Sequence, residues 1–152
     1  MNVTSHNFFL AFILAITVIA CQAVPDCDQE SSYTFLKIKL YDKDSLWVER
    51  VKYDSIKAVG SDSLFFTSSD SLSTYSLEVN SSKGSSTFLF YSALNVDSVS
   101  VAFDRDVKIP FAACGPIFNI YNVSITKSTF DSTILTNNLL NINIAENIEV
   151  YQ

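Results

Sequence analysis

An alternation of apolar and polar residues with a period of two restricts the fold more than any other feature of this chain. Residues 36–40 read LKIKL, so that three aliphatic side chains alternate with two lysines. In an extended strand this pattern places the apolar side chains on one face, as a half-buried antiparallel sheet requires. The same period recurs in residues 75–79, 99–103, 121–125 and 140–144. No window after residue 30 offers a helical stripe longer than about two turns, so we predict an all-β domain.

Turns separate these strands at regular intervals. Asp-Ser pairs, whose side chains bond nearby backbone amides and favour turns, begin at positions 44, 54, 62, 70, 97 and 131. The first four are ten, eight and eight residues apart, which is the spacing of short strands in a sandwich or barrel. Residues 64–66 and 88–91 are apolar on both faces and are expected to form central strands. We predict an antiparallel β-sandwich, immunoglobulin-like or transthyretin-like, with about seven to nine short strands over residues 33–152. A closed barrel is the alternative.

The composition narrows the function classes. A net charge of −6 argues against nucleic acid as a partner, because nucleic acids select basic surfaces. The single histidine is His6, in a segment that we expect to be removed, which excludes His-based triads and His metal sites in the mature domain. No G-x-S-x-G motif is present to supply a serine nucleophile. We therefore expect a protein that is not an enzyme and that carries no cofactor and no metal.

The N-terminus has the pattern of an export signal. Residues 8–20 form an apolar run broken only by Thr17, and a helix of that length spans about 20 Å, less than the hydrocarbon core of a bilayer. Signal peptides have such a run, although residues 1–7 lack the usual Lys or Arg. The sequence Val-Ile-Ala-Cys at residues 18–21 resembles a bacterial lipobox. The resemblance implies that residues 1–20 are a lipoprotein signal peptide with a signal helix, and that Cys21 becomes a lipidated N-terminus. Cleavage after Ala23, which would release a soluble domain, is the alternative.

The cysteine count fits the lipid interpretation. Three cysteines leave one over in an exported protein, but lipid on Cys21 leaves only Cys27 and Cys114. Because disulfides persist in an oxidising compartment, we predict a Cys27–Cys114 disulfide. Two unpaired buried thiols are the alternative. Residues 21–32 are small, polar and acidic, and are expected to form a tether between the lipid and the domain.

Aromatic residues near the first strand are the candidate ligand-binding residues. Trp47 follows two aspartates, and Tyr41 and Tyr53 lie close to it in sequence, as in a platform that stacks sugars. A tryptophan half-buried at the edge of the core is the competing interpretation. Asp104 and Asp106 lie two residues apart and could form a pair of catalytic carboxylates, but a charged strand end explains them better.

The chain also resembles a group of small lipoproteins of Bacteroidota whose function is unknown. The matching features are the closely spaced Cys21 and Cys27, a strand that ends in Tyr41-Asp42, a Ser-Asp-Ser turn at residues 69–71, Ala-Cys-Gly at residues 113–115 followed by Phe118, and an Asn-rich C-terminal strand. The resemblance implies attachment to the outer membrane and an all-β fold, and it supplies no catalytic residues.

Together these features predict a lipid-anchored, non-enzymatic structural or interaction module of the cell envelope. Its expected partners are the membrane, reached through the N-terminal lipid, and an envelope protein or glycan. An extracytoplasmic glycan-binding module is the alternative. Residues 22–24, which follow Cys21, carry no acidic cluster of the kind associated with surface export in this phylum, so the periplasmic face is favoured over the cell surface.

Overall fold

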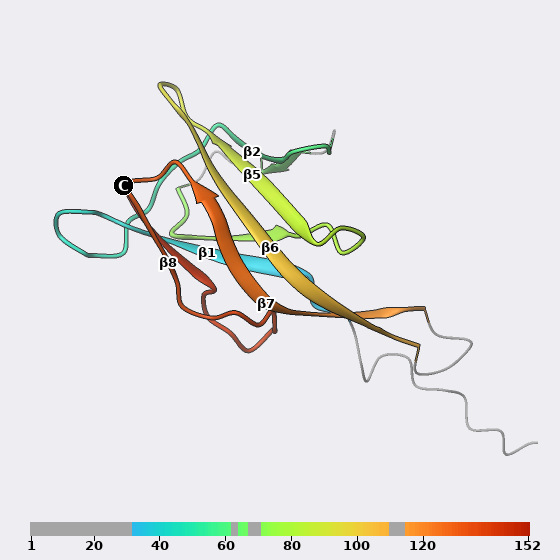
Figure 1. Ribbon diagram of the computed structural model, residues 1–152. Coiled ribbons are helices and arrows are strands. Elements are labelled where there is room, and N and C mark those ends of the chain that lie inside the picture. The colour runs from blue at the N-terminus through green and yellow to red at the C-terminus, as the bar shows by residue number, and fades with distance from the viewer. Residues whose placement is uncertain (1–31, 62–63, 67–70, 110–114) are drawn as a thin grey trace, which may run out of the picture.

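The computed structural model describes residues 32–61, 64–66, 71–109 and 115–152. The predicted signal peptide, Cys21, Cys27 and Cys114 lie outside these residues. Within them, nine strands form two sheets, which confirms the predicted all-β sandwich and its strand number (Figure 1). The strands are β1 (Phe35–Tyr41), β2 (Ser55–Ala58), β3 (Leu64–Phe66), β4 (Thr74–Glu78), β5 (Ser85–Tyr91), β6 (Val96–Lys108), β7 (Ile117–Ser128), β8 (Ser132–Leu135) and β9 (Ile148–Tyr151). The described part of the chain has no helix long and apolar enough to cross a membrane.

The two sheets differ in the direction of their strands. The five-stranded sheet has the order β3-β2-β5-β6-β7 and is antiparallel throughout. The four-stranded sheet has the order β4-β1-β9-β8, and its central pair, β1 and β9, is parallel. A parallel pair needs a long connection, which the seven intervening strands provide.

The inner faces of the two sheets form the core. Leu36, Ile38 and Leu40 of β1 are fully buried, while the lysines between them lie on the outer face, as the alternation predicts. The five-stranded sheet supplies Phe88 and Phe90 from β5 to the same core. The ring of Phe90 lies edge-on to those of Tyr53, Tyr75 and Phe130, with centroids 5.1 to 6.4 Å apart. Such edge-on aromatic pairs stabilise a core beyond the area that they bury.

Two strand predictions are wrong in ways that have a physical cause. Residues 64–66 form β3 at the edge of the sheet, not a central strand. Residues 140–144 form a turn, in which Ile142 is 71% exposed. The Asn141 side chain accepts a hydrogen bond from the Asn143 backbone, which favours a turn over a ladder. The last strand is instead β9, so the predicted Asn-rich C-terminal strand is also wrong.

One predicted turn is also wrong. The Asp97-Ser98 pair lies inside β6 and does not end a strand. The Thr129 hydroxyl donates to Asp97 Oδ1 at 3.1 Å and accepts from the Ser98 backbone at 2.8 Å. Because both polar groups find their partner across the sheet, the pair does not need a turn.

A projecting hairpin extends the five-stranded sheet at one end. From Asp104 to Lys108 every residue of β6 is exposed, and the partner segment of β7 begins at Ile117. The pairing shifts register between Ala102 and Asp104, where Asn122 on β7 has a φ of 51°. Bulges of this kind bend a strand pair and increase its twist. We call the part beyond it, residues 104–109 and 115–121, the arm (Figure 1).

The chain enters the domain beside this arm. The backbone N–H of Phe118 donates to Ser32 Oγ at 2.8 Å. From there β1 runs across the sandwich to a loop that projects at the opposite end (Figure 1). The molecule therefore has two distinct ends, one with the chain entry and the arm, and one with the loop that follows β1.

Candidate functional site

The loop that follows β1, residues 42–48, is an ordered turn. Asp42 Oδ1 accepts hydrogen bonds from the backbone of Asp44 at 3.1 Å and of Ser45 at 2.6 Å. The Asp42 backbone N–H donates to the carbonyl of Trp47 at 2.9 Å, and Tyr41 pairs with Val48 in an antiparallel bridge. We call this segment the Trp47 loop. Its shape is set by its own hydrogen bonds, so its apolar tip is held in place.

The Asp42 carboxylate organises this turn. Hydrogen bonds from the side chain and the backbone of Ser45 lower the pKa of the Asp42 carboxyl. Leu46, whose N–H donates to the Asp42 carbonyl at 2.9 Å, has a φ of 60°, a conformation that side-chain-bearing residues seldom adopt. The hydrogen bonds around Asp42 hold this strained backbone.

Three consecutive apolar side chains face solvent on the Trp47 loop. Leu46 is 66% exposed, Trp47 77% and Val48 47%. The interpretation of Trp47 as a half-buried residue of the core edge is therefore wrong, because the loop projects beyond both sheets. Leu46 also borders a shallow hollow of about 290 Å³ that includes Ile134 and Tyr151. Contiguous exposed apolar groups of this kind mark surfaces that contact another molecule.

The predicted aromatic platform is divided among three places. Tyr41 lies on the outer face of β1 and stacks on Tyr151, with ring centroids 5.3 Å apart. Because Tyr41 pairs with Val48, the alternation of side chains puts Trp47 on the other side of the loop. Tyr53, which is only 4% exposed, lies in the core, where its hydroxyl donates to Gln152 Oε1 at 2.8 Å. Its assignment to the platform is corrected, since a buried ring cannot stack on a ligand.

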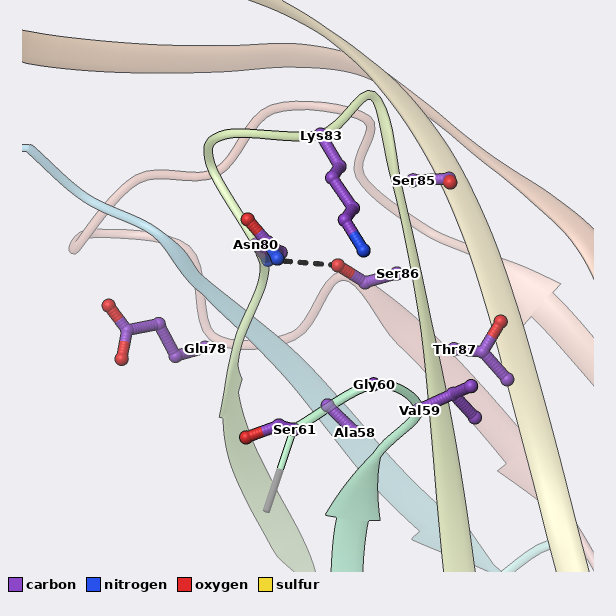
Figure 2. A pocket seen from close by; sticks show the side chains of 10 residues that line it. All are labelled: Ala58, Val59, Gly60, Ser61, Glu78, Asn80, Lys83, Ser85, Ser86 and Thr87. Atoms are coloured by element: carbon purple, nitrogen blue, oxygen red, sulfur yellow. Dashed lines mark hydrogen bonds between the residues drawn. The ribbon is translucent and has the colours of Figure 1, made fainter. Parts of the chain in front are cut away.

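A second recess opens at the edge of the sandwich between the two sheets. It has a volume of about 310 Å³ and lies between the turn after β2 and the β4–β5 turn. Figure 2 shows Lys83 pointing into it from the β4–β5 turn, toward Ser86, whose hydroxyl accepts a hydrogen bond from the Asn80 backbone at 2.9 Å. The carboxylate of Glu78 points away and accepts from Thr34 Oγ1 at 3.2 Å. The recess can admit a small polar molecule, but it does not join Lys83 and Glu78 as an acid–base pair.

Asp104 and Asp106, considered above as a pair of carboxylates, both lie on the surface of the arm. Asp104 accepts a hydrogen bond from the Asn122 side chain at 2.9 Å. Among the side chains that the structure describes, no three of the His, Cys, Asp or Glu type are grouped closely enough to hold a metal ion.

A family of unknown function, DUF6452, matches residues 54–152. The chain belongs to this family. The DUF6452 match covers β2 to β9, and it includes both the arm and the recess around Lys83. β1 and the Trp47 loop precede the matched part, although β1 supplies three of the buried core residues. We find no curated protein and no solved structure that matches the chain.

The sequence contains a feature from which the exposure of Leu46 and Val48, beside Trp47, could have been predicted. Leu46 and Val48 flank Trp47 in a stretch otherwise made of charged and polar residues, DKDSLWVER. Three large apolar residues next to a predicted Asp-Ser turn have no strand face to occupy, which points to exposure. The family match begins at residue 54 and therefore does not include this segment.

Proposed function

We propose that this protein is a lipid-anchored, non-enzymatic interaction module of the bacterial cell envelope, with the Trp47 loop as its contact surface. Lipid on Cys21 attaches it to the outer membrane, and residues 21–32 serve as the tether. The observation that carries the proposal is the 77% exposure of Trp47 at the tip of an ordered turn. The partner is an envelope protein, met on the periplasmic side.

The arrangement of the two ends supports this orientation. The chain enters beside the arm, where Phe118 binds Ser32, and the Trp47 loop lies at the other end of β1 (Figure 1). A protein held at its N-terminus by lipid would therefore present the Trp47 loop away from the membrane to which it is attached.

The order of the loop favours binding as well. A residue held in place before binding loses little conformational freedom when a partner docks. Tryptophan is also the residue type most enriched among those that dominate the affinity of protein interfaces. The hydrogen bonds of Asp42 thus prepare the apolar tip for contact.

The anchor can be tested by metabolic labelling with a fatty acid. We expect label on the wild-type protein and none on the Cys21→Ser variant. Equal labelling of the two proteins, or none of either, would show that Cys21 carries no lipid. Protease treatment of intact cells then distinguishes the faces, since a periplasmic protein is protected until the outer membrane is opened.

The contact surface can be tested by photo-crosslinking in the native cell. A photoreactive residue at position 47 should give a discrete crosslinked product. The matched control is position 94, because Leu94 is 92% exposed on the β5–β6 turn, outside the Trp47 loop. Identical products from both positions, or none from position 47, would contradict the assignment of the surface.

A glycan-binding module is the second candidate. The exposed indole of Trp47, with Asp42 and Asp44 close by in the same turn, offers a stacking face beside hydrogen-bond acceptors. Sedimentation of the purified domain with insoluble peptidoglycan tests this candidate. Trp47→Ala should abolish co-sedimentation and Leu94→Ala should preserve it, whereas equal co-sedimentation of the two variants would reject glycan binding at this loop.

A further inference from the structure

We propose that the arm rests on the lipid surface to which the chain is attached, and that it is a second membrane contact beside the lipid on Cys21. This inference rests on the proposed anchor. The lipid supplies the attachment, and the arm fixes how the domain stands on the membrane.

The arm is amphipathic beyond Ile120, which is fully buried and belongs to the core. Val107 and Phe118 are opposite each other in the β6–β7 pairing. Ile109 directly follows β6, and the alternation of side chains along an extended chain puts it on the same face as Val107. Val107 is 47% exposed and Ile109 67%, and Phe118 is half-buried. The exposed Asp106 and Lys108 occupy the other face together with the buried Ile117, and the exposed Arg105 lies on the face of Val107.

Alternation of this kind is expected where one face of a strand is covered. In the inner half of β6 the core covers that face, and Val99 and Val101 are fully buried. In the outer half, Ile120 of β7 is still fully buried on this face and Phe118 is half-buried, but every residue from Asp104 to Ile109 is exposed. Beyond Ile120 the core therefore no longer covers this face at Val107. An apolar strand face without a protein partner is suited to an apolar surface outside the protein.

The position at which the chain enters the domain indicates that this apolar surface is the lipid bilayer. The Ser32 hydroxyl accepts a hydrogen bond from the backbone N–H of Phe118, whose side chain lies on this face. Ser32 comes only eleven positions after Cys21, and a fully extended chain of that length spans about 36–40 Å. A lipid on Cys21 therefore keeps the bilayer within reach of the arm, the nearest part of the domain. The tether itself is a poor cover, because Asp26, Asp28 and Glu30 make it acidic.

The two ends of β6 provide a matched pair of positions for the test. Ile109 follows its last residue, and Leu94, which is 92% exposed, lies just before its first residue. A strand of thirteen residues separates them by about 43 Å. Both side chains are exposed, so a tryptophan at either position should leave the fold intact.

The experiment uses the full lipidated protein in phosphatidylcholine vesicles, with and without brominated acyl chains. Trp47→Phe removes the sole native indole. On this background, Ile109→Trp and Leu94→Trp each introduce one reporter, and flotation of the vesicles measures attachment separately. We expect brominated lipid to quench most of the emission of the Ile109→Trp protein and to leave that of the Leu94→Trp protein unchanged.

The other outcomes separate the two proposals. If the vesicles carry the protein but brominated lipid does not quench the Ile109→Trp protein, the anchor stands and the arm contact is wrong. Equal quenching of both reporters also rejects the arm contact, because the domain then lies on the membrane without a preferred end. If the protein does not float with the vesicles, both the anchor and the arm contact are wrong.

Discussion

The backbone N–H of Phe118 donates to the Oγ of Ser32 at 2.8 Å, and this bond joins the start of the domain to the start of β7. β7 is the edge strand of its sheet, so the bond also satisfies one of its outward amides. Ser32 is five residues from Cys27, and Phe118 is four residues from Cys114. The segments that carry the two cysteines thus leave the described structure near the same place.

The predicted Cys27–Cys114 disulfide requires this neighbourhood, since the two Cα atoms must come within about 4.4–6.8 Å. The cysteines are 87 positions apart, and the loop-entropy model gives about 4.6 kcal/mol as the upper value of the stabilisation. We expect mass spectrometry of oxidised protein to show a linked peptide pair, and Cys27→Ser with Cys114→Ser to lower the unfolding midpoint as a reducing agent does. Alkylation of both thiols without prior reduction would rule the bond out.

Asn147 replaces part of the β1–β9 ladder with its side chain. It is 1% exposed, its Oδ1 accepts from the Lys37 backbone at 3.0 Å, and its Nδ2 donates to the carbonyls of Asn137 and Leu139. Asn147→Ala leaves these buried backbone groups unpaired, and we expect it to lower the free energy of unfolding by about 3 kcal/mol. Asn143→Ala, at an exposed position in the same segment, should change it by less than about 0.5 kcal/mol. Urea unfolding of the two variants measures the difference, and equal values would contradict the role of Asn147.

The sequence predicts the strands whose inner face is buried, because burial of one face leaves a period of two. β1 and the first half of β6 are of this kind, with residues 36–40 and 99–103 placed as expected. The parallel pairing of β1 with β9 is not visible in the sequence, since nothing local marks which distant strand lies beside β1.

The candidate site was predicted only in part for a similar reason. Trp47 was identified by its residue type, but whether its ring is buried depends on the direction in which the loop leaves the sheet. Tyr53 was selected in the same way, as an aromatic residue, but it lies in the core, where Tyr75 and Phe90 pack on its ring. Residue type indicates what a side chain can bind, and the fold decides whether it is exposed.

Asn122 sets the bend at the base of the arm. Its φ of 51° is tolerated by asparagine and glycine, whereas a β-branched residue is strained there. We expect Asn122→Val to lower the free energy of unfolding by about 1–2 kcal/mol more than Asn122→Gly does. Both variants lose the bond to Asp104, so the comparison isolates the backbone. Thermal unfolding measures the difference between the two variants. Equal unfolding midpoints would show that a β-branched side chain causes no strain at this position.

The buried hydroxyl of Tyr53 makes the free energy of unfolding depend on pH in the alkaline range. Burial raises the pKa of its hydroxyl well above the usual value of 10.0, and the nearby Asp97 acts in the same direction. Above pH 10 the unfolded chain loses this proton while the folded chain keeps it, so stability is complete below pH 10 and falls as pH rises.

Tyr53→Phe should therefore flatten the loss of stability above pH 10. At neutral pH the variant should be about 1 kcal/mol less stable, because the bond to Gln152 is lost. Urea midpoints measured across the alkaline range test this, with Tyr33→Phe as the control at a half-buried position outside the main core. An equally steep decline in the Tyr53→Phe variant would contradict the assignment.

The central claim is that the protein presents Trp47 to solvent while its other end is attached to the membrane. Because Trp47 is the sole tryptophan, quenching of its fluorescence by iodide in membranes that carry the lipidated wild-type protein reads this one side chain. We predict a red-shifted emission that iodide quenches as fully as it does in the detached Cys21→Ser protein. A blue-shifted emission that iodide cannot reach in either protein would contradict the account.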